Sequence, residues 1–226
     1  VIAHTEIDPS KKTVLLYAHH DVQPVGDLSL WDTEPFNPTL KDGRLYGRGS
    51  GDNKAGVVVH YNVVKQLLND LPVNIRIFIE GEEEIGSPTM SDFIEQNREA
   101  LEADVIVIAD SANVKIGVPT ITTTLRGLVD GFIEVDQPMR PVHSGMGGGV
   151  VPDAFMVLSK IIASFHDDKG NLQIEGLTPT DMNVTELDES YTKKMLGSDE
   201  INLFDTESIS KRLWLEPALD VLAIDA

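Results

Sequence analysis

The order of apolar runs along the chain constrains its fold more than any other feature. Three short runs at 13–18, 74–80 and 104–109 have the length and the aliphatic, β-branched content of strands in a sheet. Between them, residues 54–68 and 90–102 carry apolar side chains three and four positions apart, which predicts helices. Strands that alternate with helices are typical of a parallel sheet with crossover helices. We therefore expect an α/β fold with a mostly parallel sheet and flanking helices.

The pattern changes after about residue 120. Apolar and polar residues within 120–137 alternate with period two and no helical segment interrupts them, which predicts antiparallel strands. A glycine-rich loop and an amphipathic helix over 153–165 follow. We interpret residues 1–120 as one domain and residues 121–226 as a second α+β unit.

Composition excludes several classes of function. A net charge of -19, from 37 acidic and 18 basic residues, disfavours nucleic acid or an anionic membrane as a partner. The chain has no cysteine, so any metal must be held by His, Asp and Glu. No apolar run approaches the ~20 residues of a membrane span, and the first residues lack the pattern of a signal peptide. We expect a cytoplasmic protein without a membrane partner.

Histidine and acidic residues gather where the predicted strands end. His19 and Asp21 follow the first strand, the acidic run 80–84 ends the second, and Asp110 follows the third. Asp52 stands just before the first helix. In a parallel sheet these positions meet at one edge, where the acidic groups repel one another unless a cation neutralises them. Mixed imidazole and carboxylate ligands suit zinc, manganese or cobalt better than calcium or magnesium, so a metal site is predicted.

Each pattern alone also has a structural explanation. His19 and Asp21 could form a hydrogen-bonded pair without a ligand. Asp52 could be a helix N-cap, and Asp110 could begin a turn. The joint occurrence of these residues at one edge favours the metal site. His20 is expected to point to the opposite side of an extended chain and to have a structural role.

Five motifs then occur in a characteristic order, and together they resemble the family-twenty metallopeptidases. That family includes carboxypeptidase G, aminoacylase, succinyl-diaminopimelate desuccinylase and the carnosine-type cytosolic dipeptidases, and the dipeptidase branch is the most similar. The resemblance covers about residues 13 to 176. The motifs are AHHDVQP at 18–24, Trp31 with PF at 35–36, DGRLYGRGSGDNKAG at 42–56, EGEEEIGS at 80–87 and VHSGMGGG at 142–149.

The resemblance implies a zinc-exopeptidase-like fold, in which residues 1–120 would be an incomplete metal-binding catalytic domain and residues 121–226 a partial lid and dimerisation domain. It also implies two divalent metal ions, with zinc expected ahead of manganese or cobalt. His19 and Asp110 would bind one metal, and Glu84 would bind the other. Asp52 would bridge the two ions. Family members also supply one further metal-binding histidine, and no residue of this chain matches it.

Three further roles are carried over from the same family. Glu83 would be the general base, and Asp21 would orient His19. Glu82 competes with Glu83 on sequence alone, although the motif places it one position too early. His143 would come from a lid domain that also forms a homodimer, and would stabilise the oxyanion in the partner's site. Without the family, His143 reads as a loop histidine, and its GMGGG neighbours lack the Lys-Ser/Thr pair of a phosphate loop.

The resemblance predicts a metallopeptidase that hydrolyses the peptide bond of dipeptides with a metal-activated water. Two alternatives stay open, an N-acyl amino acid amidohydrolase and an inactive scaffold that binds partners through an exposed sheet edge. The chain begins and ends in apolar stretches and is shorter than family members, so we expect a fragment with a partial lid. The chain alone is expected to have weak activity or none.

Overall fold

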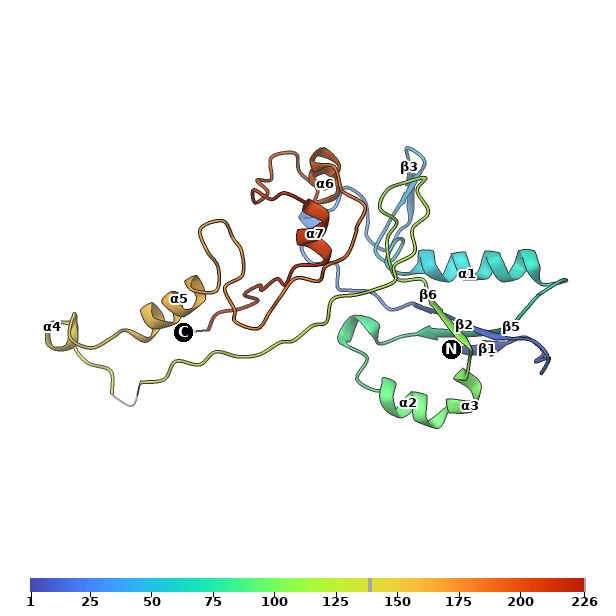
Figure 1. The fold of residues 1–226 in the computed structure, drawn as a ribbon, viewed down its shortest axis with the longest axis horizontal. Coiled ribbons are helices and arrows are strands. Elements are labelled where there is room, and N and C mark those ends of the chain that lie inside the picture. Colours follow the sequence, from blue (N-terminus) through green and yellow to red (C-terminus); the bar gives the residue numbers. More distant parts are fainter. Residues whose placement is uncertain (138–139, 226) are drawn as a thin grey trace. The chain divides into compact units, whose positions relative to one another are not determined.

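The computed structural model describes residues 1–137 and 140–225 (Figure 1). The chain forms two compact units, Val1–Val118 and Pro119–Ala226, which are described separately. Within the described ranges, no helix has the length and apolar character needed to cross a membrane.

The first unit is built on a four-stranded sheet with the order β1-β5-β2-β6. Strand β2 pairs in parallel with both β5 and β6, whereas β1 is antiparallel to β5. The predicted α/β fold with a mostly parallel sheet is confirmed. A separate hairpin joins β3 and β4. The strands are β1 Ile2–His4, β2 Thr13–His19, β3 Thr39–Lys41, β4 Arg44–Tyr46, β5 Asn74–Glu80 and β6 Val105–Ile108.

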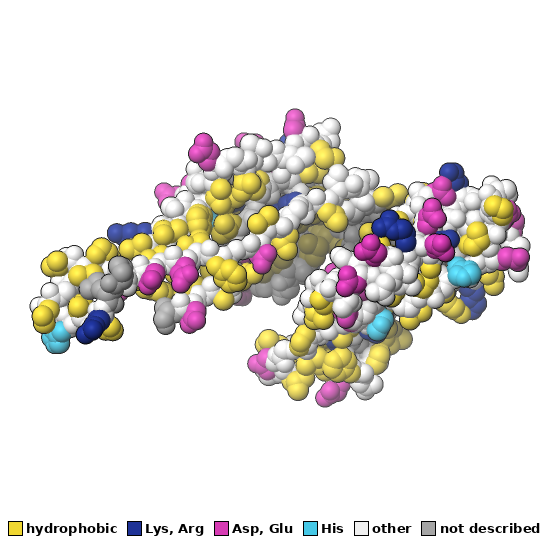
Figure 2. Space-filling view, turned by 90° about the horizontal axis from the view of Figure 1, so that it is seen from below, with side chains coloured by type: hydrophobic (Ala, Val, Ile, Leu, Met, Phe, Trp, Pro, Cys, Tyr) yellow, Lys and Arg dark blue, Asp and Glu magenta, His cyan; other side chains and the backbone are white. Residues whose placement is uncertain are grey.

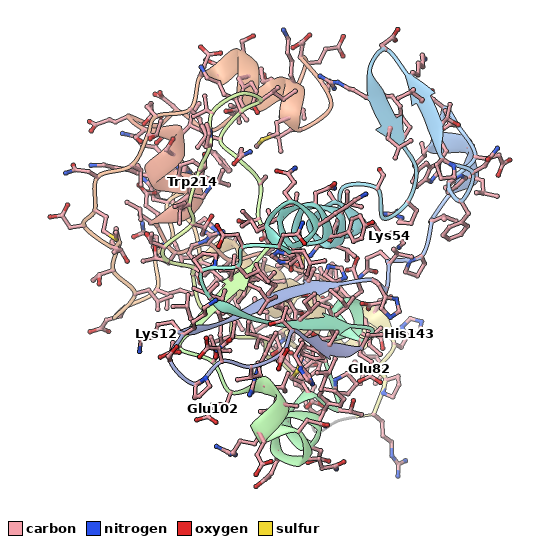
Figure 3. The ribbon with its side chains drawn as sticks, turned by 90° about the vertical axis from the view of Figure 1, so that its right-hand side faces the viewer. Lys12, Lys54, Glu82, Glu102, His143 and Trp214 are labelled. Atoms are coloured by element: carbon pink, nitrogen blue, oxygen red, sulfur yellow. The ribbon has the colours of Figure 1, made fainter. Side chains whose placement is uncertain are left out.

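Helices flank the sheet on both sides. Helix α1 (Lys54–Leu67) lies on one side, and α2 (Met90–Gln96) and α3 (Arg98–Leu101) lie on the other (Figures 1 and 3). The single helix predicted over 90–102 is interrupted at Asn97, whose Nδ2 donates to the carbonyl of Phe93 at 2.8 Å. Asparagine side chains compete in this way for backbone hydrogen bonds and favour helix ends.

The core of the first unit lies on the two central strands. Leu15, Leu16 and Ala18 of β2 and Ile75 and Phe78 of β5 are buried. Strand β6 was expected to be buried, but its side chains are 43 to 60% exposed because β6 is an edge strand with one neighbour in the sheet. The best-packed strands are therefore β2 and β5, and their carboxyl ends carry the site.

The second unit is less regular than predicted. Strands expected within 120–137 are absent. Among the described residues between 119 and 225, the only β-pairing is the isolated bridge between His166 and Leu172. Leu128, Val129 and Phe132 are 92 to 101% exposed, and a period-two segment forms a strand only where one face packs on a partner. Hydrophobic side chains reach the surface over much of the face in Figure 2.

Four helices, α4 to α7, are described in this unit. Helix α5 falls within the predicted 153–165, and the Asp153 side chain caps it by accepting from the N–H of Met156 at 2.8 Å. The assignment of residues 121–226 to a lid stays a prediction. The helices are α4 Ser144–Gly147, α5 Ala154–Ala163, α6 Glu189–Met195 and α7 Ile209–Trp214.

Asn74, the first residue of β5, ties the loop before β2 to the sheet. Its side chain is buried, its Oδ1 accepts from the N–H of Asp8 at 2.9 Å, and its Nδ2 donates to the carbonyl of Asp8 at 2.9 Å and of Lys11 at 3.1 Å. These bonds fix the chain as it enters β2, the strand that ends at the site.

Replacing Asn74 with Ala is expected to lower the free energy of unfolding by about 2 kcal/mol, because the partly buried hydrogen bonds of its side chain to the backbone of Asp8 and Lys11 are lost. Urea unfolding followed by circular dichroism measures the loss. The matched control is Asn62→Ala, since Asn62 is exposed on α1 and its side chain bonds only to the carbonyl of Val58 among the contacts described. Its effect is expected to stay within about 0.5 kcal/mol. Equal losses for the two variants would contradict the role of Asn74.

Candidate metal centre

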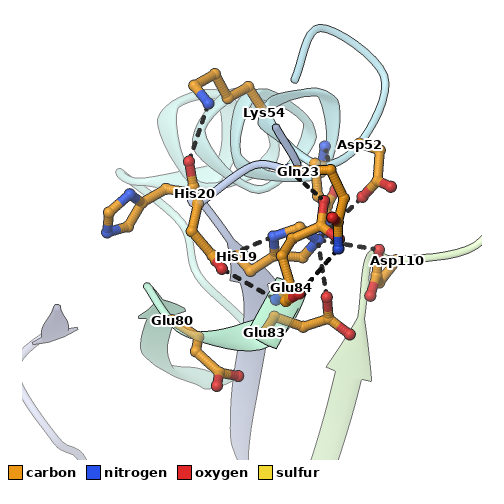
Figure 4. A network of polar contacts seen from close by, with 12 residues as sticks. His19, His20, Gln23, Asp52, Lys54, Glu80, Glu83, Glu84 and Asp110 are labelled. Atoms are coloured by element: carbon orange, nitrogen blue, oxygen red, sulfur yellow. Dashed lines mark hydrogen bonds and ion pairs between the residues drawn. The ribbon is translucent and has the colours of Figure 1, made fainter. Parts of the chain in front are cut away.

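The carboxyl ends of β2 and β5 bring the site together. His19 ends β2 and lies opposite Glu80, the last residue of β5, in the parallel register. The 3-10 turn η2 (Glu83–Ile85) follows β5. Asp110 follows β6, and Asp52 stands just before α1. Figure 4 shows the side chains from these elements converging on His19.

Carboxylates surround one nitrogen of a buried imidazole. The His19 side chain is 1% exposed, and its Nε2 lies 3.0 Å from Oδ1 of Asp52. The same nitrogen is 3.6 Å from Oδ1 of Asp110 and 3.8 Å from Oε2 of Glu83. One ligand atom from each of His19, Asp52 and Glu84 lies within 4.8 Å of the others. The structure thus groups the ligands expected in the first unit around His19.

Asp21 faces the other nitrogen of the ring. Its Oδ1 lies 3.3 Å from Nδ1 of His19, and its Oδ2 accepts from the N–H of Glu84 at 3.0 Å. Burial raises the pKa of Asp21, but the N–H of Glu84 and the neighbouring imidazole outweigh it and lower that pKa. Asp21 is therefore an ionised group placed to orient His19 and the turn that carries Glu84.

The electrostatics of the cluster favour a bound cation. Burial lowers the pKa of His19, but the carboxylates of Asp110, Asp52 and Glu83 outweigh that effect and raise it. The pKa values of Glu83 and Asp110 are raised, first by burial and then by repulsion from neighbouring carboxylates. A bound cation would relieve this repulsion, and the nitrogen and oxygen donors fit a divalent metal of the zinc type.

The structure decides between several of the alternatives that the sequence left open. Asp52 is not the N-cap of α1, because Asn53 holds that position and accepts from the N–H of Gly56 at 3.1 Å. Glu82 is engaged elsewhere, since its Oε2 accepts from the hydroxyl of Thr89 at 2.6 Å. Of the two glutamates considered as a base, Glu83 is the one beside His19.

Three other histidines have separate surroundings. His20 points away from the cluster, and its carbonyl accepts from Nζ of Lys54 at 2.9 Å (Figure 4). His60 is buried on α1, where its Nε2 donates to the carbonyl of Tyr17 at 2.8 Å. His143 belongs to the second unit, where it caps α4 and its Nδ1 accepts from the N–H of Gly145 at 3.0 Å.

Two residues that border the cluster, Tyr17 and Gln23, were not among those predicted. Tyr17 donates its hydroxyl to Oε2 of the buried Glu80 at 2.5 Å, and burial together with that carboxylate raises the pKa of Tyr17. Gln23 contacts Glu84. Tyr17 stands two residues before His19 on β2, so the period of a strand places both on one side. That spacing was the available signal for Tyr17, and the same spacing from Asp21 was the signal for Gln23.

Residues 15–209 match the peptidase family M20/M25/M40, and the chain belongs to that family. The resemblance inferred from the motifs is confirmed. The chain is 36% identical to a cysteinylglycine-S-conjugate dipeptidase of Corynebacterium striatum, over 93% of this chain and 48% of that protein. It is 35% identical to the Beta-Ala-His dipeptidase of Homo sapiens, over 100% of this chain and 47% of that protein.

Solved structures are similar over nearly the whole chain. An M20 family metallo-carboxypeptidase from Sulfolobus solfataricus gives a TM-score of 0.68 at 29% identity, covering 94% of this chain and 50% of that chain. Human carnosine dipeptidase 1 gives a TM-score of 0.65 at 31% identity, covering 94% and 47%. The chain therefore spans about half the length of the relatives it matches.

Zinc binding to the metal-free protein is expected to release protons. The zinc affinity should fall as the pH falls, by up to about tenfold per pH unit for each proton displaced. The raised pKa values of His19, Glu83 and Asp110 set the direction of this effect, because protons compete with the metal for these groups up to a higher pH. Calorimetric titration at several pH values, in two buffers of different ionisation enthalpy, measures both effects. Asp52→Asn is expected to weaken binding strongly. Affinity that does not change with pH would contradict this account of the site.

Proposed function

We propose that the protein is a metal-dependent peptidase that hydrolyses dipeptides. One observation carries the proposal: a buried imidazole, His19, has its Nε2 faced by carboxylates from three other segments of the chain. Membership of the peptidase family and similarity to named dipeptidases support it. The substrate would be a small peptide, since the relatives act on dipeptides according to their names.

The metal ligands of the proposal are His19, Asp52, Glu84 and Asp110. Zinc is the favoured metal, with manganese or cobalt as alternatives, because the donors are one imidazole nitrogen and carboxylate oxygens. Two ions are proposed, with Asp52 between them; its side chain is 72% exposed and so is open to a second ion. Bound metal would polarise the peptide carbonyl and lower the pKa of a water molecule.

Glu83 is proposed as the general base. Its Oε2 lies beside the cluster, and burial raises its pKa, which makes its carboxylate a better proton acceptor. It would take the proton of the attacking water and deliver it to the leaving amine. Asp21 would keep His19 in the orientation that presents Nε2 to the metal.

Other parts of the proposal rest on the family resemblance. The second unit would act as a lid and form a homodimer, and His143 would stabilise the oxyanion in the partner's site. A cytoplasmic location, the one expected from the sequence, is also part of the proposal.

Replacing Glu83 with Gln in the complete gene product is expected to lower kcat for dipeptides by about 10²- to 10⁴-fold, because the water loses its base. Bound metal, measured by elemental analysis, should be unchanged. Glu82→Gln is the matched control, since Glu82 bonds to Thr89 and should leave kcat close to the wild-type value. Equal effects of the two substitutions would refute the assignment of the base.

A substrate panel separates the proposed activity from its alternative. Turnover of dipeptides above N-acetyl and N-succinyl amino acids is expected, and the reverse preference would identify a deacylase instead.

A further inference from the structure

Gln23 contacts Glu84 through both its backbone and its side chain. Its backbone N–H donates to Oε1 of Glu84 at 3.2 Å. Its Nε2 donates to Oε2 of Glu84 at 2.9 Å and to the carbonyl of Glu84 at 2.8 Å. Figure 4 shows the Gln23 side chain lying against Glu84 beside the His19 cluster.

We propose that Gln23 is a positioning residue that holds Glu84 in the geometry needed to bind metal. The inference rests on the proposed function, because it treats Glu84 as a metal ligand. It adds to that function a residue outside the proposed ligand set and the proposed proton-transfer path.

The contacts restrain the carboxylate and the main chain of Glu84 together. Asp21 accepts from the N–H of Glu84, and Gln23 donates to the carbonyl of the same residue, so the peptide groups on both sides of Glu84 are tied to the loop after β2. Each carboxylate oxygen of Glu84 also accepts one N–H from Gln23. A glutamate has three rotatable side-chain bonds, and neighbours that fix them raise the affinity of a ligand for its metal.

The chemistry of an amide suits this task. Each carboxylate oxygen has two lone pairs, so an oxygen that accepts from Gln23 keeps a lone pair for a metal ion. The amide carries no charge, and therefore it steadies Glu84 without acting as a competing cation. Glu84 needs such support because Glu83 and Asp52, which lie in the same cluster, repel its carboxylate in the absence of metal.

The end of β2 and the loop after it thus contribute to the site through alternate residues. His19 presents its Nε2 to the carboxylates, Asp21 stands against its Nδ1, and Gln23 holds Glu84. In an extended chain, residues two apart share a side, so the segment 19–23 delivers all of these groups in one direction.

The test compares zinc affinity in the metal-free wild-type protein and three variants, using competition with a chromogenic chelator. Glu84→Gln identifies the binding site that depends on Glu84. Gln23→Met keeps the length of the side chain and removes its two donors, and it is expected to weaken zinc at that same site by about 10- to 100-fold. Gln66→Met is the matched control, because Gln66 is an exposed glutamine on α1, and wild-type affinity is expected.

Stability separates positioning from a general structural role. The urea midpoint of metal-free Gln23→Met is expected to match that of Gln66→Met. Wild-type zinc affinity in Gln23→Met, while Glu84→Gln loses a site, would overturn the inference and leave the proposed function intact. A loss of affinity that tracks a loss of stability would also overturn it. Failure of Glu84→Gln to affect any site would remove Glu84 from the ligand set, and the proposed function would lose that ligand together with this inference.

Discussion

The contact between the buried His19 imidazole and the carboxylates around its Nε2 is the interaction on which the site depends. With its side chain 1% exposed, the ring is held within the sheet edge, and Asp21 stands against its second nitrogen. The nitrogen that faces the carboxylates is therefore fixed in position before any ligand binds. Such acidic surroundings are costly without a cation or protons, and the raised pKa values of Glu83 and Asp110 reflect that cost.

The architecture supplies this contact from segments far apart in the sequence. Parallel pairing of β2 with β5 and β6 puts the residues that follow all three strands at one edge. The cap formed by Asn53 starts α1 directly after Asp52, which leaves that carboxylate free to face His19. Hydrogen bonds from Gln23 and to Asp21 join the loop after β2 to the turn after β5. The pairing of β2 with β5 therefore places the side chains of the candidate metal centre next to one another.

Sequence patterns predicted most of the first unit and less of the second. The apolar runs and helical periodicity located β2, β5 and α1 to within a residue at each end, because these elements bury a face against neighbours in the same unit. Periodicity could not show that β6 would be an exposed edge strand, since burial depends on what packs beside it. No strand forms within 120–137 despite the alternation, and Leu128, Val129 and Phe132 in that segment are almost fully exposed. Asn97 breaks a helix that periodicity alone continues. At the site, His19, Asp21 and Asp110 were predicted from their positions at strand ends, and Asp52 from its position before a helix. For Gln23 the two-residue spacing from Asp21 was the only signal, since a neutral amide in a loop is ordinary.

The most direct test of the account is a crystal structure of the protein soaked in zinc, with diffraction data collected on both sides of the zinc absorption edge. The account predicts an anomalous difference peak within bonding distance, about 2.0–2.2 Å, of Nε2 of His19 and of a carboxylate oxygen of Asp52. A zinc-soaked crystal with peaks only at other surface residues, and none at His19, would contradict the claim that this sheet edge is a metal centre.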